Sequence, residues 1–134
     1  MTSFRRVMVI DDDMDFAGFV EVVLSAHGYE VVCAETAESA VEQLRAKPAD
    51  LIIVDAMLSH SLGGWDVLKD IRALQGCQRI AVLLVSAVVH GDESELFPQG
   101  NGLWNRFMCK PISPQALVGA IAELLAERGD VDHG

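Results

Sequence analysis

Short apolar runs alternate along the chain with longer segments in which apolar residues recur every three or four positions. The short runs are typical of strands whose two faces are both covered, and the periodic segments are typical of amphipathic helices. Strands are predicted at residues 7–10, 30–34, 51–54, 80–85 and 105–109. This regular alternation predicts a parallel sheet with helices on both of its faces.

Capping residues support several of the helices between these strands. Helices are predicted at residues 16–27, at 36–47, from about 65 onward and from 113 onward. Gly28 is a suitable C-terminal cap for the first helix, and Thr36 is a suitable N-cap for the second. Ser113 followed by Pro114 is a typical helix start. Because the crossovers between parallel strands are right-handed, five strands predict a flavodoxin-like, doubly wound sheet with strand order 2-1-3-4-5.

The segment between the fourth and fifth predicted strands fits this scheme poorly. A helix is expected there, but only residues 92–97 could form one, because Pro98, Gly100 and Gly102 follow. A short or mobile element is therefore expected. No repeat or second domain is evident, so residues 1–128 are expected to form one domain, with residues 129–134 as a flexible C-terminal tail.

Composition narrows the class of protein. The chain has 134 residues, of which 51% are hydrophobic and 22% charged, as expected for a globular domain. The net charge of −10 argues against direct binding of nucleic acid, which needs Lys and Arg. No apolar run is long enough to cross a membrane and no signal peptide is evident, so a cytoplasmic location is expected. The three cysteines are too widely spaced for a zinc site.

The functional site is expected where the strands end, because open α/β sheets bind their ligands at the carboxyl ends of the strands. The polar residues at these ends are Asp11, Asp12 and Asp13 after the first strand, Asp55 after the third, Ser86 after the fourth and Lys110 after the fifth. Crowded carboxylates repel one another, and a divalent cation relieves that repulsion. Since the set offers oxygen ligands without His or Cys, it indicates Mg²⁺ rather than zinc.

A carboxylate beside a bound Mg²⁺ can act as a nucleophile toward phosphorus and form an acyl phosphate. Lys110 and the Ser86 hydroxyl would then bind the added phosphoryl oxygens. Asp13 is nearest the first helix, and two roles remain open for it: a helix cap, or a residue that supports the metal ligands. The ordered set predicts a phosphoryl-accepting site.

These motifs resemble those of bacterial two-component response-regulator receiver domains, of the stand-alone, chemotaxis-regulator-like kind. The similar segments are residues 9–13, 51–58, 83–87 and 107–111, and the resemblance extends to about Glu127. It implies that Asp55 is the phosphorylated residue. It also implies that Asp11, Asp12 and Asp55 bind Mg²⁺ together with the main-chain carbonyl of Met57.

The resemblance assigns further roles. Lys110 matches the phosphate-binding lysine, Ser86 the switch hydroxyl and Phe107 the switch aromatic. The phosphoryl group would come from a histidine kinase or a histidine phosphotransfer protein, and the domain would catalyse its own phosphorylation and dephosphorylation. An unidentified downstream protein would receive the output, and homodimer formation is left open.

Two residues that flank the acceptor in such domains predict a long-lived signal. In receivers, the residues two positions past the phosphoacceptor and two past the switch hydroxyl flank the approach of the hydrolytic water. Here they are Met57 and Val88. Neither can hydrogen-bond a water strongly, so slow loss of the phosphoryl group is expected.

The sequence also departs from the family pattern. Ser59 stands where a proline is usual, the loop at residues 59–64 is one residue longer than usual, and the segment before Phe107 is also longer than usual. His60 and His90 are single loop residues, and neither is expected to be a phosphorelay or metal residue. Two alternatives remain: a pseudo-receiver that binds partners without phosphorylation, and a nucleotide- or flavin-binding domain. The missing Gly-x-Gly-x-x-Gly motif counts against the second alternative.

Overall fold

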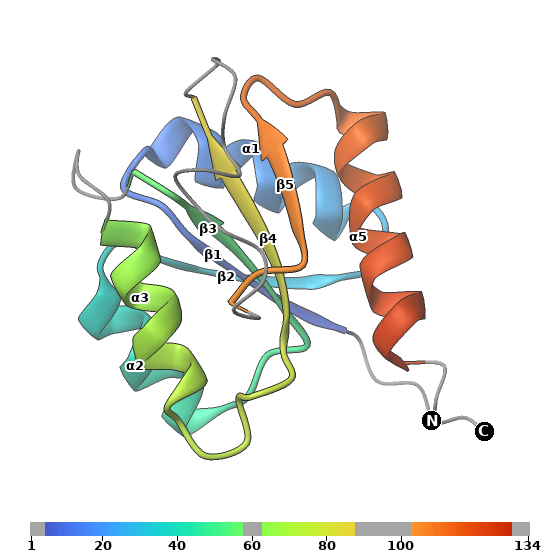
Figure 1. Cartoon of the computed structure of the whole chain (residues 1–134). Coiled ribbons are helices and arrows are strands. Elements are labelled where there is room, and N and C mark those ends of the chain that lie inside the picture. The colour runs from blue at the N-terminus through green and yellow to red at the C-terminus, as the bar shows by residue number, and fades with distance from the viewer. Residues whose placement is uncertain (1–4, 58–62, 88–102, 130–134) are drawn as a thin grey trace.

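The computed structural model describes residues 5–57, 63–87 and 103–129. Its elements follow in the order β1 (Arg6–Ile10), α1 (Met14–Ser25), β2 (Glu30–Ala34), α2 (Ala37–Ala46), β3 (Leu51–Asp55), α3 (Gly63–Arg72), β4 (Ala81–Ser86), β5 (Arg106–Cys109) and α5 (Pro114–Gly129). Figure 1 shows the strands as one sheet with helices packed against it.

The five strands form a parallel sheet with the order β2-β1-β3-β4-β5. The predicted doubly wound, flavodoxin-like fold is therefore confirmed. Each strand begins and ends within one residue of its predicted bounds. The third and fourth strands extend slightly further than expected, so that Asp55 and Ser86 are their last residues. Because all pairings are parallel, the carboxyl ends of the strands lie at one edge of the sheet (Figure 1).

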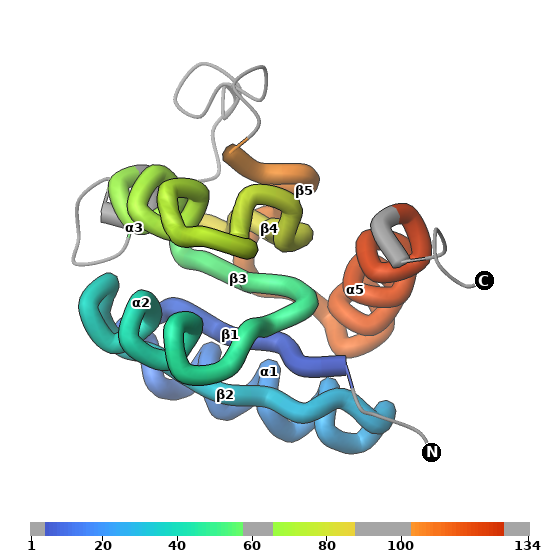
Figure 2. Tube along the Cα trace, turned by 90° about the horizontal axis from the view of Figure 1, so that it is seen from below, coloured from blue at the N-terminus to red at the C-terminus, as the bar shows by residue number. Residues whose placement is uncertain are grey.

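Different helices cover the two faces of the sheet. Successive residues of a strand face opposite sides, and β1 shows this clearly. Met8 and Ile10 pack in a core with residues of α2 and α3, whereas Val7 and Val9 pack in a second core with residues of α1 and α5. Figure 2 shows α2 and α3 side by side along one face. The solid apolar runs of β3 and β4 are fully buried, as two covered faces require.

Side-chain caps begin three of the helices. The Asp13 carboxylate accepts the backbone N–H groups of Asp15 and Phe16, so the structure gives Asp13 the role of N-cap of α1. Thr36 accepts the Ser39 N–H at the start of α2, and the Ser113 hydroxyl accepts the Ala116 N–H at the start of α5. These bonds satisfy N–H groups that the helix itself cannot pair.

Glycines mark two further boundaries. After α1, Gly28 has a φ of 90°, a conformation that favours glycine and allows the chain to turn back toward β2. The helix α3 begins at Gly63, two residues before the expected start near Trp65. Two consecutive glycines are poor helix formers, which is why the sequence placed this start too late.

Arg72, the last residue of α3, forms hydrogen bonds with the segments that precede β4 and β5. Its guanidinium group donates to the carbonyl oxygens of Cys77, Gln78 and Ile80, which precede β4. It also donates to the Leu103 carbonyl at 3.2 Å, shortly before β5. A planar guanidinium group with several donors suits such a bridging position.

Several sequence predictions lie outside the described residues. They are the loop with Ser59 and His60, the short helix at 92–97, Val88, His90 and the tail beyond Gly129. Among the described helices, none is both long enough and apolar enough to span a bilayer.

Candidate functional site

Three carboxylates meet at the carboxyl edge of the sheet. Carboxylate oxygens of Asp11, Asp12 and Asp55 all lie within 4.8 Å of one another. β1 and β3 are neighbours in the sheet, with Ile10 opposite Val54. The residues that follow these two positions are therefore brought together, although they lie far apart in the sequence. The predicted acidic cluster is present, and its members come from two adjacent strand ends.

Asp11 is the most enclosed member of this cluster. It is 1% exposed, and its carboxylate accepts the Asp13 N–H at 2.8 Å and the Lys110 ammonium at 2.9 Å. Burial raises the pKa of the Asp11 carboxyl above its ordinary value, and the charge of Asp55 raises it further. The hydrogen bonds from Asp13 and Lys110 act in the opposite direction. Burial and the neighbouring carboxylate therefore make the ionised form of Asp11 less favourable, and a bound cation would offset this effect.

Asp55 is the last residue of β3 and is also buried. One carboxylate oxygen, Oδ1, accepts the Met57 N–H at 3.0 Å. The other, Oδ2, lies 3.6 Å from the Lys110 ammonium. The carboxylate is thus oriented by the chain that follows it and faces a positive charge.

Lys110 follows β5, the edge strand of the sheet, and its side chain reaches back to the acidic cluster. Its backbone N–H donates to the Ser86 carbonyl at 2.8 Å, which places Lys110 directly after the β4–β5 pair. Its ammonium group reaches Asp11 and Asp55 and lies 4.0 Å from Asp13 Oδ2. The side chain of Lys110 is 15% exposed. A partly buried cation among carboxylates is well placed to bind an anionic group that forms there.

Phe16 is a neighbour of the cluster that sequence reasoning missed. The Lys110 ammonium lies over its ring, 4.4 Å from the ring centroid. The apolar periodicity of α1 indicated only a core residue at this position. An aromatic residue in the first turn of the helix that follows the acidic run was the available clue.

Ser86 and Phe107 lie on one face of the sheet. Ser86 is fully buried at the end of β4, and Phe107 is half-buried on β5 opposite Leu84. Leu84 and Ser86 are two residues apart on one strand, so they face the same side. The Phe107 ring packs edge-on against Trp104, with 6.0 Å between ring centroids. The structure thus brings the predicted switch residues into neighbouring positions.

The acidic cluster fits a magnesium ion by its chemistry. All of its side-chain donors are carboxylate oxygens, and no His or Cys among the described residues belongs to the group. Mg²⁺ prefers such ligands and is commonly held by one or two carboxylates together with waters and phosphate oxygens. Met57, whose carbonyl is the remaining predicted ligand, follows Asp55 closely and is half-buried at the same strand end.

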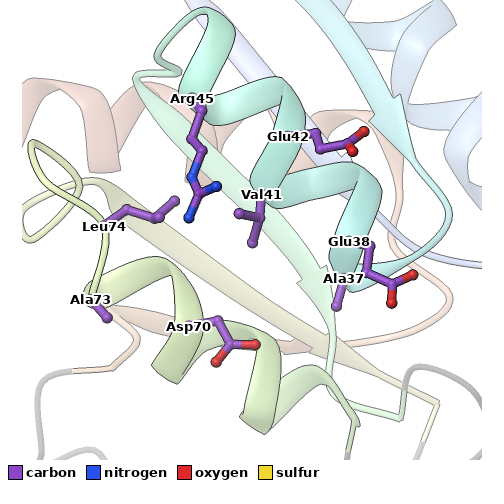
Figure 3. A pocket seen from close by; sticks show the side chains of 8 residues that line it. All are labelled: Ala37, Glu38, Val41, Glu42, Arg45, Asp70, Ala73 and Leu74. Carbon is purple, nitrogen blue, oxygen red and sulfur yellow. The ribbon is translucent and has the colours of Figure 1, made fainter.

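Two recesses in the described part of the chain differ in their relation to this cluster. One, of about 550 Å³, adjoins Lys110 and is lined by Asp13, Asp15, Phe16, Phe19, Ala87, Lys110, Pro111 and Ile112. The other, of about 480 Å³, lies between α2 and α3 (Figure 3). There Arg45 of α2 and Asp70 of α3 line a groove that contains none of the clustered carboxylates. The first recess contains none of these carboxylates either, but it includes Lys110, whose ammonium reaches Asp11 and Asp55.

Comparison with known proteins agrees with this geometry. The family model for the response regulator receiver domain matches residues 7–122. The phosphate regulon transcriptional regulatory protein PhoB of Escherichia coli (strain K12) is 30% identical over 121 residues, which cover 90% of this chain and 52% of PhoB. The chain therefore spans about half the length of that curated relative.

Solved structures show the same fold. The CheY-like response regulator receiver domain protein of Methanospirillum hungatei JF-1 has a TM-score of 0.84 at 24% identity, over 97% of this chain and all of that one. The chemotaxis response regulator CheY4 of Vibrio cholerae has a TM-score of 0.80 at 20% identity, over 91% of this chain and 99% of that one. The family match and the strand-end residues lead to one conclusion: the chain belongs to the response regulator receiver domain family.

Proposed function

We propose that Asp55 accepts a phosphoryl group from a histidine kinase or a histidine phosphotransfer protein, with the assistance of Mg²⁺. One observation carries this proposal. The Asp55 carboxylate lies within 4.8 Å of the carboxylates of Asp11 and Asp12 and 3.6 Å from the Lys110 ammonium. A buried carboxylate close to two further carboxylates and to a lysine ammonium is suited to hold a phosphoryl group.

The metal would be held by Asp11, Asp12, Asp55 and the main-chain carbonyl of Met57. When bound, Mg²⁺ supplies positive charge that offsets the charge of the transferring phosphoryl group. The chain's own residues perform the remaining work. Asp11 is fixed by the Asp13 N–H and Asp55 by the Met57 N–H, so neither carboxylate has to be ordered during the reaction.

Phosphoryl transfer to this site needs one bond to form and one to break. An Asp55 carboxylate oxygen forms a bond to phosphorus while the P–N bond of the donor phosphohistidine breaks. The electron pair of that bond stays with the imidazole nitrogen. The product is an acyl phosphate that carries more negative charge than the carboxylate did, and Lys110 and the Ser86 hydroxyl would bind its oxygens.

The signal would leave through the face that carries Ser86 and Phe107. Ser86 would move toward the phosphoryl oxygens, and Phe107 would occupy the space that this movement opens. A downstream output protein or domain would recognise the changed face. A receiver supplied by an ATP-dependent kinase works where ATP is present, so the proposed location is the cytoplasm.

Phosphorylation by a small donor tests the proposal. The protein is incubated with phosphoramidate and Mg²⁺, and acid-labile phosphate is measured by intact-mass spectrometry. We expect one phosphoryl group on the parent protein and none on Asp55→Asn. The control Asp66→Asn changes an exposed aspartate of α3 and should be labelled like the parent.

Two results would contradict the proposal. Full labelling of Asp55→Asn would show that the acceptor is another residue. A parent protein that accepts no phosphoryl group and does not bind beryllofluoride with Mg²⁺ would favour the pseudo-receiver alternative.

A further inference from the structure

We propose that Phe16 is a positioning residue for Lys110: its ring face holds the lysine ammonium beside Asp11 and Asp55 through a cation–π contact. This inference rests on the proposed function, because it concerns the lysine that would bind the phosphoryl group. The ammonium lies 4.4 Å from the ring centroid, well within the range of about 6 Å in which such contacts are attractive.

The position of Lys110 needs such a restraint. A lysine ammonium group sits on a flexible four-carbon chain and can reach several partners. Here the alternatives are close, since Asp13 Oδ2 is 4.0 Å away and half-exposed, whereas Asp11 and Asp55 are buried. Solvent or Asp13 could therefore draw the ammonium outward. The ring covers one side of the ammonium and favours the inner position.

The ring itself is firmly placed. The Phe16 N–H donates to Asp13 Oδ1 at 3.3 Å, so the N-cap of α1 fixes the backbone that carries the ring. Phe16 is buried and contacts Phe19, with 6.1 Å between the ring centroids. A contact in a largely desolvated position is stronger than one at an exposed site, because water screens the charge less.

A simple packing role makes a different prediction. If Phe16 only fills space, any apolar side chain of similar volume will do. If the ring face binds the ammonium, the effect depends on the electron density of the ring. Fluorine atoms withdraw that density with little change in size, so a series of fluorinated phenylalanines separates the two roles.

The test places phenylalanine with one, two or three ring fluorines at position 16 of the full chain. The rate of phosphorylation by phosphoramidate with Mg²⁺ is measured over a range of donor concentrations. We expect the second-order rate constant to fall stepwise with fluorination, and to fall about 2- to 30-fold in Phe16→Leu. The maximal rate and the half-saturating donor concentration are resolved separately, and beryllofluoride affinity should weaken in the same order.

Phe19 supplies the matched control. It lines the same recess and lies on the same helix, but the ring over which the Lys110 ammonium lies is that of Phe16. The fluorine series at position 19 should leave the rate constant unchanged. In a Lys110→Met background, fluorination at position 16 should no longer alter beryllofluoride affinity.

The outcomes separate this inference from the proposed function. A flat fluorine series at position 16, in a protein that is phosphorylated normally, overturns the role of Phe16 and leaves the phosphoacceptor intact. A loss in Phe16→Leu without any trend among the fluorinated proteins does the same, because it indicates packing alone. A parent protein that accepts no phosphoryl group overturns both.

Discussion

The Lys110 ammonium donates a hydrogen bond to Asp11 at 2.9 Å and lies 3.6 Å from Asp55. In this state the lysine is bonded to a proposed metal ligand and only adjacent to the proposed phosphoacceptor. Its positive charge thus compensates the buried charge of Asp11. Binding of Mg²⁺ would provide that compensation instead and leave the lysine available for a phosphoryl oxygen.

Replacing Lys110 should therefore have an effect that depends on metal. Lys110→Met leaves the Asp11 carboxylate buried without its cation, and we expect the metal-free protein to lose about 1–3 kcal/mol of unfolding free energy. Saturating Mg²⁺ should recover part of this loss. Urea unfolding with and without Mg²⁺ measures both effects.

Lys69 provides the comparison for this substitution. Its ammonium lies 4.0 Å from Asp66, and both side chains are mostly exposed. Lys69→Met should change the unfolding free energy by less than about 0.5 kcal/mol, with or without Mg²⁺. Equal losses in the two variants would argue against a structural role for the buried pair.

Magnesium should stabilise the folded protein by mass action. A ligand that binds only the native state adds about 2.7 kcal/mol at one hundred times its Kd. Asp12→Ala should weaken this stabilisation, because it removes one of the clustered carboxylates, and should raise the metal-free stability through reduced repulsion. Melting temperatures over a Mg²⁺ titration measure both effects. Asp66→Ala serves as the control, and a parent Tm that ignores Mg²⁺ would count against the metal site.

The fold was largely predictable because apolar runs define buried parallel strands. The runs in β1, β3 and β4 have no polar interruption, so their bounds were predicted to within one residue. The start of α3 was harder to predict from the sequence. Gly63 and Gly64 disfavour a helix locally, so helix propensity alone did not predict that α3 begins at Gly63.

The members of the site were predictable from strand ends, but their pairing was not. The parallel pairing of β1 and β3 brings the backbones of Asp11 and Asp55 together at the carboxyl ends of the strands, independently of the conformations of their side chains. The choice of Asp11 as hydrogen-bond partner of Lys110, 99 residues away, depends on side-chain conformations. The contact of Phe16 with Lys110 could not be predicted for the same reason. Apolar periodicity identifies the buried face of a helix, but it does not show which group the Phe16 ring contacts.

Phe107 should report the activated state. It shares a sheet face with Ser86, so movement of the hydroxyl toward a phosphoryl group would change the packing of the ring. We expect the NMR signals of the Phe107 ring to shift when beryllofluoride and Mg²⁺ bind. Ser86→Ala should reduce that shift while Asp55 still binds beryllofluoride. Unchanged Phe107 signals in the parent protein would show that this domain does not couple in the proposed way.

Met57 should lengthen the life of the phosphorylated state. It is half-buried beside Asp55 and cannot orient an attacking water by a strong hydrogen bond. Met57→Asn should accelerate loss of the phosphoryl group several-fold, whereas Met57→Leu should not. The loss is followed by intact-mass spectrometry after the donor is removed. Loss within seconds in the parent protein, or equal rates in the two variants, would contradict this prediction.

The hydrogen bonds of Arg72 have a consequence for the placement of Lys110. Its guanidinium group bonds the carbonyls of Ile80, before β4, and Leu103, before β5. Asn105 adds a further anchor, because its side chain accepts the Val82 N–H at 2.7 Å. The start of β5 is thus attached to the body of the domain independently of the connection between residues 88 and 102. A substitution of Arg72 should therefore loosen the start of β5, and with it the placement of Lys110 beside the acidic cluster, although Arg72 touches neither the lysine nor a carboxylate of the cluster.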